Sequence, residues 1–452
     1  MIRQLLGRFF RRKQSGQDQA QRQQKPQAQV LKASELGLDL SAISQAAMRT
    51  CETLQQAGFK AFIVGGGVRD LLLGRRPKDF DVATNATPEE VVKLFRRART
   101  IGKRFQIVHV YFGRELIEVS TFRAIQAEAE TDAHGRVLKD NVWGSQEEDA
   151  ARRDFTVNAL YLDPIGDQLL DYHQGYRDLQ AKTLRMIGDP ASRYREDPVR
   201  MLRVARFAAK LDFHIESQTR APIADMADLL THVPAARLFD ELLKLLTSGH
   251  SLACIQTLRS EGLHHGLLPL LDGIFSSESG ERFIQQALRN TDARIAADKS
   301  ISPGFLLAAL LWPQVLSAWQ ARIERGEHQT PALMAAADEV LVQQSDRLAI
   351  QKRFAADMRE IWAMQIRFER CTGRAPWRLM EHLRFRAGFD FLLLRAQAGE
   401  PCEALAQWWD QFVQAEEPDR EALLQSAPQR QTGGPRRGTR RRKRTPSAGT
   451  AH

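Results

Sequence analysis

The chain has 452 residues, of which 43% are hydrophobic and 27% charged, a composition typical of a globular protein with two or more domains. Its four cysteines lie far apart without a CxxC pair, which excludes a disulfide framework or zinc knuckle and favours a cytoplasmic location. No apolar run approaches the roughly 18 residues of a membrane helix, so we expect no transmembrane segment.

The net charge of +10 comes from the two ends of the chain. Residues 1–13 carry five Lys or Arg and no acid, and residues 422–452 carry eight and no acid, which leaves −3 between them. We expect a disordered Arg-rich tail at 415–452 that attracts polyanions, with a solubilising end as the alternative. The basic extension and Gln-rich linker at 1–38 are expected to be disordered or to form an amphipathic helix for RNA or a membrane surface.

The first elements alternate between helix and strand. Helical spacing predicts a helix over 40–58, and a β-branched run predicts a strand over 60–66 that ends in glycines. The stretch "DFDVAT" predicts another strand, and Thr87 and Pro88 give the cap and first position of the next helix.

A hairpin and a long helical region follow. The runs "IVHVYFG" and "ELIEVSTFR" predict two strands around Gly113. Beyond about residue 190 the strand signal disappears, and helical patterns dominate to about residue 414. The sequence therefore predicts a small α/β head followed by a long helical body.

Three consecutive glycines, Gly65 to Gly67, separate a predicted strand from the predicted helix "VRDLLLG". Backbone amides at such a turn can point at an anion, and Arg69 adds a positive charge beside it. Taken alone, three glycines after a strand more often form a simple turn, and Arg69 has a local ion pair with Asp70 as its alternative.

Asp79 and Asp81 are two residues apart, so on a strand both carboxylates leave the same face. Paired carboxylates are good ligands for Mg²⁺, with phosphate oxygens and water completing the coordination. Glu118 on the neighbouring predicted strand offers a third carboxylate for two-metal chemistry, with a solvent-facing strand residue as the alternative.

The segment "EEDAARRDFTVNALYLD" places Arg152, Arg153, Asp154 and Asn158 at an expected helix start. Arg153 beside a triphosphate and Asp154 beside a ribose hydroxyl are the functional interpretation, and Asp154 as a plain N-cap is the alternative.

A later helix carries a second polar set. Asp197 and Arg200 are three residues apart and are expected to share a helix face that presents an acceptor and donors to a nucleotide base. Arg203 and Arg206 continue that side. An ordinary surface salt bridge is the alternative.

Three of these stretches together resemble the class II nucleotidyltransferases, the family of tRNA CCA-adding enzymes and bacterial poly(A) polymerases. They are "GGGVRDLLLGRRPKDFDVAT", "RRDFTVNAL" and "REDPVRMLRVARFAAKL". The resemblance implies a catalytic head of the DNA-polymerase-β type with a five-stranded mixed sheet, then an elongated all-α neck and body that bind RNA. We place the head at 39–187, the neck at 188–250 and the body at 251–414.

The resemblance also implies roles for individual residues. Asp79 and Asp81 would bind Mg²⁺, and Glu118 or Asp154 would supply the third essential carboxylate. The residues expected to bind the nucleotide are Gly66, Gly67, Arg69, Arg153, Asp197, Arg200, Arg203 and Arg206.

Two further stretches and the Arg-rich end favour the poly(A) polymerase branch. "TIGKRFQIVHVYFG" and "PWRLMEHLRFRAGFDFLLLRAQAGE" are similar to segments of bacterial poly(A) polymerases. The resemblance implies template-independent addition of AMP from ATP to RNA 3′ ends, with release of pyrophosphate, in RNA turnover. The basic ends of the chain would contact RNA-degradation proteins or a membrane surface. A CCA-adding enzyme that uses CTP and ATP is the alternative.

Overall fold

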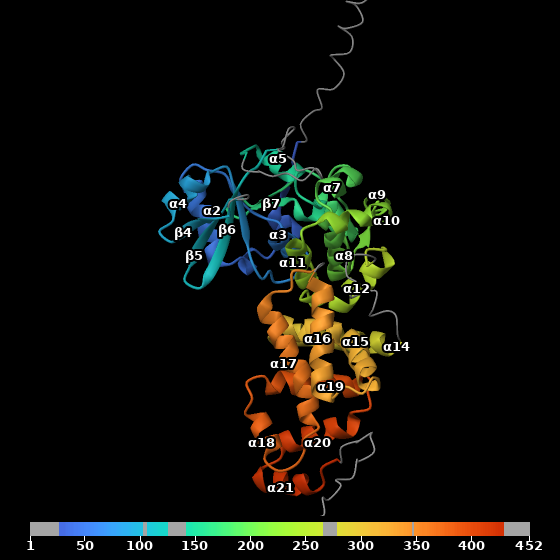
Figure 1. The fold of residues 1–452 in the computed structure, drawn as a ribbon. Helices are drawn as coiled ribbons and strands as arrows, with labels where there is room; N and C mark the ends of the chain where they lie inside the picture. Colours follow the sequence, from blue (N-terminus) through green and yellow to red (C-terminus); the bar gives the residue numbers. More distant parts are fainter. Residues whose placement is uncertain (1–26, 103–105, 125–141, 265–277, 346–347, 429–452) are drawn as a thin grey trace, which may run out of the picture. The chain divides into compact units, whose positions relative to one another are not determined.

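The computed structural model describes residues 27–102, 106–124, 142–264, 278–345 and 348–428. The expectations for residues 1–26 and 429–452 lie outside these ranges. Two compact units are present, and each is discontinuous in sequence. The first takes in the chain up to Gly273, with Leu288–Ile301 and Gln343–Ile350, and the second takes in the remainder (Figure 1).

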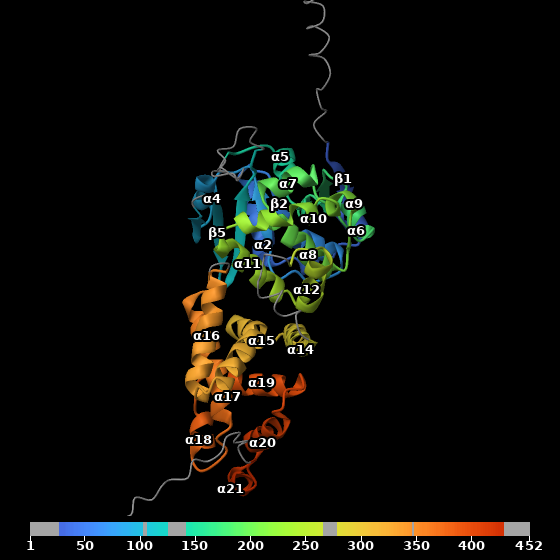
Figure 2. The same cartoon turned by 45° about the vertical axis from the view of Figure 1, so that its right-hand side comes forward.

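The first unit is built on a mixed sheet of eight strands. In spatial order these are β1 (Gln29–Lys32), β8 (Gln168–Asp171), β7 (Leu160–Asp163), β2 (Ala61–Val64), β3 (Asp81–Thr84), β6 (Glu115–Thr121), β5 (Ile107–Phe112) and β4 (Ala98–Ile101). Every neighbouring pair is antiparallel except β3 and β6, which run parallel. Figure 2 shows β1 and β5 toward opposite sides of this sheet.

The sheet is larger than the five strands expected. Short β-branched and apolar runs correctly locate β2, β3, β5 and β6, but the edge strands β1 and β4 are mostly exposed and carry no such pattern. Strand β1 pairs with β8 although it belongs to the segment expected to be a linker. The sheet therefore begins before the boundary expected at residue 39.

Both faces of the sheet are buried. Helix α2 (Gln45–Gln56) packs on the face that carries Ile63, Val82 and Val119. Phe62 and Tyr161 pack on the other face with Ala150 of α5 (Gln146–Ala151). Because alternate strand residues point to opposite faces, Asp81 lies on the Tyr161 face.

Two predicted helices are present, one directly after the glycines and one after strand β3. Helix α3 (Gly66–Leu72) follows β2 directly. Helix α4 (Pro88–Leu94) begins with a capping box in which Thr87 and Glu90 exchange side-chain and backbone hydrogen bonds. Helix α2 starts at Gln45, later than expected, because Ser44 caps it and a short 3-10 turn precedes it.

Most of the first unit beyond the sheet is helical. Its helices are α6 (Gly175–Gln180), α7 (Pro190–Glu196), α8 (Val199–Leu211), α9 (Ser217–Arg220), α10 (Ile223–Met226), α11 (Ala235–Leu246) and α12 (Ser251–Ser260). The apolar face of α8 packs on α11 and α12. Two short strands, β9 (Thr183–Leu184) and β10 (His214–Ile215), pair in parallel, so strand structure continues past residue 190, contrary to expectation.

The second unit is helical. It contains α15 (Pro303–Glu324), α17 (Lys352–Phe368), α18 (Ala375–Met380), α19 (Phe385–Gln397), α20 (Glu403–Gln414) and α21 (Glu417–Gln425). Helices α14 (Glu278–Ala296) and α16 (Gln329–Ser345) are divided between the two units. Its C-terminal core contains Phe368, Trp409 and Phe412, and Leu423 of α21 packs against it. The disordered tail expected at 415–452 is therefore wrong for residues 417–425, which are helical.

One helix departs from the expectation about apolar segments. By length and composition α15 is apolar enough to cross a membrane, and half of its most apolar stretch is buried inside the protein. Trp362 of α17 donates its Nε1–H to the carbonyl of Ala308 in α15 at 3.2 Å. In the described part of the chain, α15 is therefore an exception to the predicted absence of membrane-length segments, and α17 packs against it.

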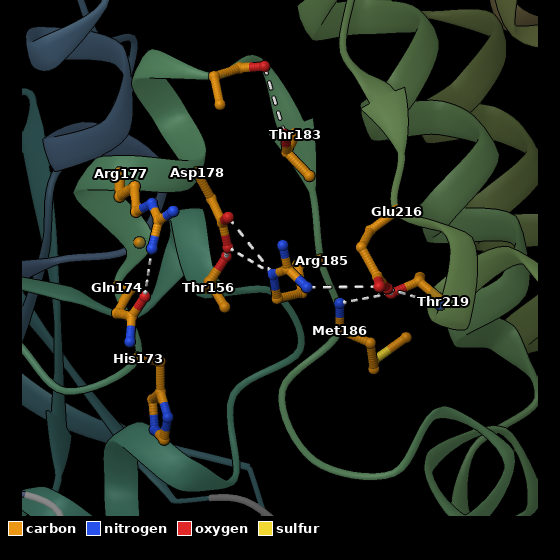
Figure 3. A network of polar contacts seen from close by, with 12 residues as sticks. Thr156, His173, Gln174, Arg177, Asp178, Thr183, Arg185, Met186, Glu216 and Thr219 are labelled. Carbon is orange, nitrogen blue, oxygen red and sulfur yellow. Dashed lines mark hydrogen bonds and ion pairs between the residues drawn. The ribbon is translucent and has the colours of Figure 1, made fainter.

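Arg185 joins the sheet part of the first unit to its helices (Figure 3). Its Nε donates to Asp178 of α6 at 3.0 Å, and its Nη1 lies 3.3 Å from Glu216, which caps α9. The same segment continues the pairing, since Met186 N donates to Thr219 Oγ1 at 3.0 Å and Thr156 N donates to Arg185 O at 3.1 Å. This network fixes the backbone that runs beside residues 154–156.

We predict that Arg185→Ala lowers the free energy of unfolding by about 1–3 kcal/mol, because the buried carboxylate of Asp178 loses a charged donor. Urea unfolding followed by circular dichroism measures the change. Arg177→Ala is the matched control, since Arg177 is exposed and its side chain bonds only Gln174, at 3.4 Å, among the described residues. Equal destabilisation by both substitutions would contradict the assigned role of Arg185.

Candidate active site

The parallel pair of strands brings three predicted carboxylates to one place. Asp81 is the first residue of β3 and stands directly opposite Glu118 of β6, while Asp79 precedes the strand by two residues. Glu118 Oε1 lies 3.5 Å from His109 Nε2 on β5. Among the described residues, no three His, Cys, Asp or Glu side chains form a group that could hold a metal ion. Phosphate oxygens and water would have to complete any coordination here.

The electrostatics of Asp81 suit a cation. Burial and the nearby carboxylates of Glu118 and Asp79 together raise the pKa of Asp81 to about 6, although Arg153 offsets part of the effect. The side chain nevertheless remains open to solvent on its cavity side. Negative charge is thus concentrated at an accessible position, which fits a site for a divalent cation.

The glycine turn allows the backbone to approach these groups closely. Gly65 has φ 71° and ψ −136°, a conformation that residues with a side chain rarely adopt. A Cβ at Gly65 would lie 3.7 Å from Arg153 Nη1 and 3.8 Å from Asp81 Oδ2, and one at Gly67 would lie 3.3 Å from the carbonyl of Asp79. The predicted residues Gly66 and Gly67 line the cavity, and Gly65 is an additional position that the sequence analysis did not assign.

Arg69 is buried and held on both sides. Its Nε and Nη2 donate to Asp70 Oδ1 at 2.9 and 2.7 Å, and its Nη1 donates to Asn158 Oδ1 at 2.7 Å. The local ion pair with Asp70 is therefore present, and Arg69 still lines the cavity. The two interpretations of Arg69 are compatible.

Arg152, Arg153 and Asp154 do not begin a helix, contrary to expectation. Ser145 forms a capping box with Glu148, so α5 begins upstream and ends at Ala151. The residues that follow lead into a short 3-10 turn at Thr156–Asn158 and then into β7. Asp154 is consequently not a helix N-cap.

A buried triad fixes Arg153. Its Nη2 donates to Asp149 at 3.0 Å and its Nε to the hydroxyl of Tyr161 at 3.0 Å, while that hydroxyl donates to Asp149 at 2.6 Å. Burial alone would lower the pKa of Arg153, but Tyr161 and Asp149 raise it, so the guanidinium stays charged. The fixed cation faces the glycine turn and the carboxylates.

Asp154 binds Arg203 of α8. Arg203 Nε donates to Asp154 Oδ2 at 2.9 Å, and Phe155 N and Asn158 Nδ2 donate to Asp154 Oδ1 at 2.8 and 3.2 Å. Burial would raise the pKa of Asp154, but Arg203 and these donors lower it to about 2. Asp154 is therefore ionised, and both of its oxygens accept hydrogen bonds.

Asp197 and Arg200 do not share a helix face, contrary to expectation. Asp197 follows α7, and α8 begins only at Val199 because Pro198 separates the two helices. Asp197 Oδ2 accepts from Arg237 of α11 at 2.9 Å, while Arg200 Nη1 donates to Glu196 at 2.8 Å. Both residues still line the cavity.

One carboxylate oxygen of Asp197 has no hydrogen-bond partner among the described residues. That oxygen, Oδ1, is buried. Arg206 lies nearby in the same lining, 3.5 Å from Glu241 and 4.4 Å above the ring of Phe207. This end of the cavity offers an unused acceptor beside cationic groups.

These groups line a cavity of about 710 Å³. Every predicted site residue contributes to it except Glu118, which stands beside Asp81 in the sheet. Eleven Arg or Lys and six Asp or Glu side chains line it, which favours an anionic ligand. The lining residues that the sequence analysis did not assign are Gly65, Asp70, Arg75, Arg76, Lys78, Val199, Phe207, Lys210, Arg237 and Glu241.

Some of these had a signal in the sequence. Arg75, Arg76 and Lys78 immediately precede Asp79, and Lys210 continues the spacing of Arg203 and Arg206 along α8. Arg237 and Glu241 are separated from the other motifs by about thirty residues, and only the packing of α11 on α8 brings them to the cavity.

Comparisons with known proteins identify the family of this chain. "Poly A polymerase head domain" matches residues 61–185, "Probable RNA and SrmB- binding site of polymerase A" matches 212–275, and "Polymerase A arginine-rich C-terminus" matches 325–445. Poly(A) polymerase I of Salmonella typhimurium is 44% identical, with 93% of this chain and 94% of that protein covered. This chain belongs to the poly(A) polymerase I family.

In sequence, CCA-adding enzymes match a smaller part of this chain than the poly(A) polymerases do. That of Lactobacillus helveticus is 40% identical over 46% of this chain and 52% of its own length. The solved Bacillus stearothermophilus CCA-adding enzyme in complex with CTP has a TM-score of 0.57 at 25% identity and covers 86% of this chain and 89% of its own. The chain is thus a poly(A) polymerase, an adenylyltransferase with the fold of the CCA-adding enzymes, as the resemblance predicted.

We predict that Asp81→Asn stabilises the metal-free poly(A) polymerase at about pH 8. The pKa of Asp81 is raised from 3.8 to about 6 in the fold, so its contribution to stability is full below about pH 4 and is lost as pH rises through 6. The variant should melt above the wild type at about pH 8 with EDTA, and this advantage should disappear near pH 4.

Added Mg²⁺ should raise the melting temperature of the wild type more than that of the Asp81→Asn variant. A variant that melts below the wild type at about pH 8 would contradict the concentration of negative charge at this site.

We predict that Gly65→Ala lowers kcat/KM by about 10²-fold, because alanine is strained at φ 71° and ψ −136°. Relief of that strain would move a turn whose added Cβ lies in van der Waals contact with Arg153 and Asp81. Gly58→Ala is the control, since Gly58 also has a positive φ, 88°, but nothing lies within 4 Å of its Cβ position. Both substitutions strain the backbone, and thermal melting should show similar losses of stability. A similar loss of activity in the two variants would remove the special role of Gly65.

Proposed function

We propose that this chain transfers AMP from ATP to the 3′-hydroxyl of RNA with Mg²⁺ held by Asp79 and Asp81, and that it acts in RNA turnover in the cytoplasm. This proposal rests on the cavity. Accessible carboxylates line it, and cationic side chains form the majority of its charged lining. Membership of the poly(A) polymerase I family supports ATP and RNA as the substrates.

The carboxylate end of the cavity would be the reaction centre. Bound Mg²⁺ would supply a Lewis acid that polarises the α-phosphate and lowers the pKa of the attacking hydroxyl. We assign the third carboxylate to Glu118, because it stands opposite Asp81 in the parallel strands. Asp154 accepts a hydrogen bond from Arg203. We assign Asp154 to positioning that arginine and to contacting the ribose of ATP.

The cationic walls would hold the triphosphate. Arg69 and Arg153 are held by Asp70, Asn158, Tyr161 and Asp149, so their charges are in place before ATP binds. Such preorganised charges stabilise the negative charge that develops on the leaving pyrophosphate at no cost in reorganisation.

The far end of the cavity would hold the base. Asp197 Oδ1 is an unused acceptor that suits the exocyclic amino group of adenine, and Arg200, Arg203 and Arg206 supply the neighbouring donors. Cytosine also carries an exocyclic amino group, so this contact by itself does not select ATP over CTP.

The rest of the chain would hold RNA. We retain the division into a catalytic head, a helical neck at 188–250 and a helical body at 251–414 as a proposal about function. The family match at 212–275 supports RNA binding by the neck and the residues after it. The basic ends remain candidates for contact with RNA-degradation proteins or a membrane surface.

The test incubates the purified protein with Mg²⁺ and either ATP or CTP, on an unstructured RNA and on a tRNA without its terminal CCA. We expect long ATP-dependent tails on the unstructured RNA, resolved on a gel. The Asp79→Ala, Asp81→Ala double variant should lose on the order of 10²- to 10³-fold or more in rate, as when a preorganised electrostatic group is removed.

Addition that uses CTP and stops within a few nucleotides on the tRNA would assign the chain to the CCA-adding activity instead. A double variant with a wild-type rate and a native melting temperature would remove Asp79 and Asp81 from the reaction.

A further inference from the structure

A second cavity lies on the other side of the loop that leads into the catalytic carboxylates. It measures about 720 Å³ and is formed by the residues around the start of α2, by Leu71 and Phe80, and by the loop from Gly74 to Lys78. Arg75, Arg76 and Lys78 line both this cavity and the proposed active site. The loop is therefore a wall common to the two cavities.

The three cations of this loop differ from those deeper in the active site. Arg69, Arg153 and Arg203 are ion-paired with neighbouring aspartates. Arg75, Arg76 and Lys78 are exposed, and none of them has an ion-pair partner among the described residues. Their charge is uncompensated and available to a ligand.

The opposite wall of the second cavity is polar and partly acidic. Asp39 and Glu115 line it, together with Ser41 and Ser44. The backbone N–H and hydroxyl of Ser41 both donate to Oδ1 of Asp39, at 2.9 and 2.5 Å, and they lower the pKa of Asp39, so it stays ionised. The three cations of the loop nevertheless outnumber the two carboxylates in the lining, and the positive charge lies along the loop that borders the active site.

A polymeric substrate requires more room than a mononucleotide. The first cavity can contain ATP and the reacting end of the RNA, but the nucleotides behind that end must leave it. Their backbone carries one negative charge per phosphate, which free cations along an exit route would bind without reading sequence. The loop 74–78 has this charge at the boundary between the two cavities.

We propose that Arg75, Arg76 and Lys78 bind the phosphates of the RNA strand just behind its 3′ end, and that the second cavity receives those nucleotides. This inference rests on the proposed function, since it assigns the path of the same RNA substrate. Phe80, the aromatic residue of the cavity lining, is only 5% exposed, so it offers little surface for base stacking. Binding here is therefore tolerant of sequence.

The test compares Arg75→Gln, Arg76→Gln with the matched double substitution Arg96→Gln, Arg97→Gln. Arg96 and Arg97 are also adjacent, exposed and without an ion-pair partner among the described residues, but they line neither cavity. Fluorescence anisotropy measures binding of a labelled oligoadenylate without ATP at several salt concentrations, and steady-state kinetics give KM for RNA and for ATP. Melting temperatures verify that both variants are folded.

We expect the loop variant to bind oligoadenylate roughly tenfold more weakly at low salt, with the slope of log K against log salt reduced by about 1.4, or about 0.7 for each cation lost. KM for RNA should rise more than KM for ATP, and the effect should be smaller with a dinucleotide primer, which does not extend into the second cavity. The Arg96, Arg97 variant should show no comparable change.

Three outcomes would overturn the proposal. A rise in KM for ATP with unchanged RNA binding would assign the loop to the triphosphate. Equal effects of the loop and control variants would mean that general surface charge is responsible, and equal effects on dinucleotide and oligoadenylate would exclude the second cavity. Because anisotropy needs no catalysis, a wild type that binds RNA but adds no AMP would contradict the proposed function and leave this assignment standing.

Discussion

The repulsion between Asp81 and its neighbouring carboxylates is the constraint around which the first unit is organised. The parallel register of β3 and β6 holds Asp81, the first residue of β3, beside Glu118 in the middle of β6. Such a pair is unfavourable on its own, and hydrogen bonding in a sheet buried on both faces keeps it in place. The repulsion lowers the stability of the fold, and the same pair of carboxylates forms a site that suits a cation.

The cations around this centre fall into two classes that suit different tasks. Arg69, Arg153 and Arg203 are paired and fixed, so they contribute position and a preset potential. The exposed cations of the loop before Asp79 have no ion-pair partner among the described residues, so no neighbouring carboxylate fixes their positions. Asp154 holds one member of the first class in place, because its bond to Arg203 joins the segment before β7 to helix α8.

Sequence patterns predicted the elements with strong local signals and failed where tertiary packing decides. Strands β2 and β3 follow from short β-branched and apolar runs, and the start of α4 follows from Thr87 as its cap and Pro88 at its first position. Strand β1 is polar and exposed, and only its pairing with β8 makes it a strand. The spacing of Asp197 and Arg200 indicated one helix face, but Pro198 ends that continuity. The cavity residues Arg237 and Glu241 follow from no motif, since the packing of α11 on α8 places them.

The division of the chain into two discontinuous units limits how it can be cut. Ser251 and Leu252, at the start of α12, donate their backbone N–H groups to Asp292 at 2.8 and 3.2 Å, and all three residues belong to the first unit. A fragment that stops at residue 273 would keep α12 and lose the carboxylate that satisfies its first amides. Neither unit therefore corresponds to one uninterrupted piece of the gene, and any fragment that contains all of one unit also carries segments of the other.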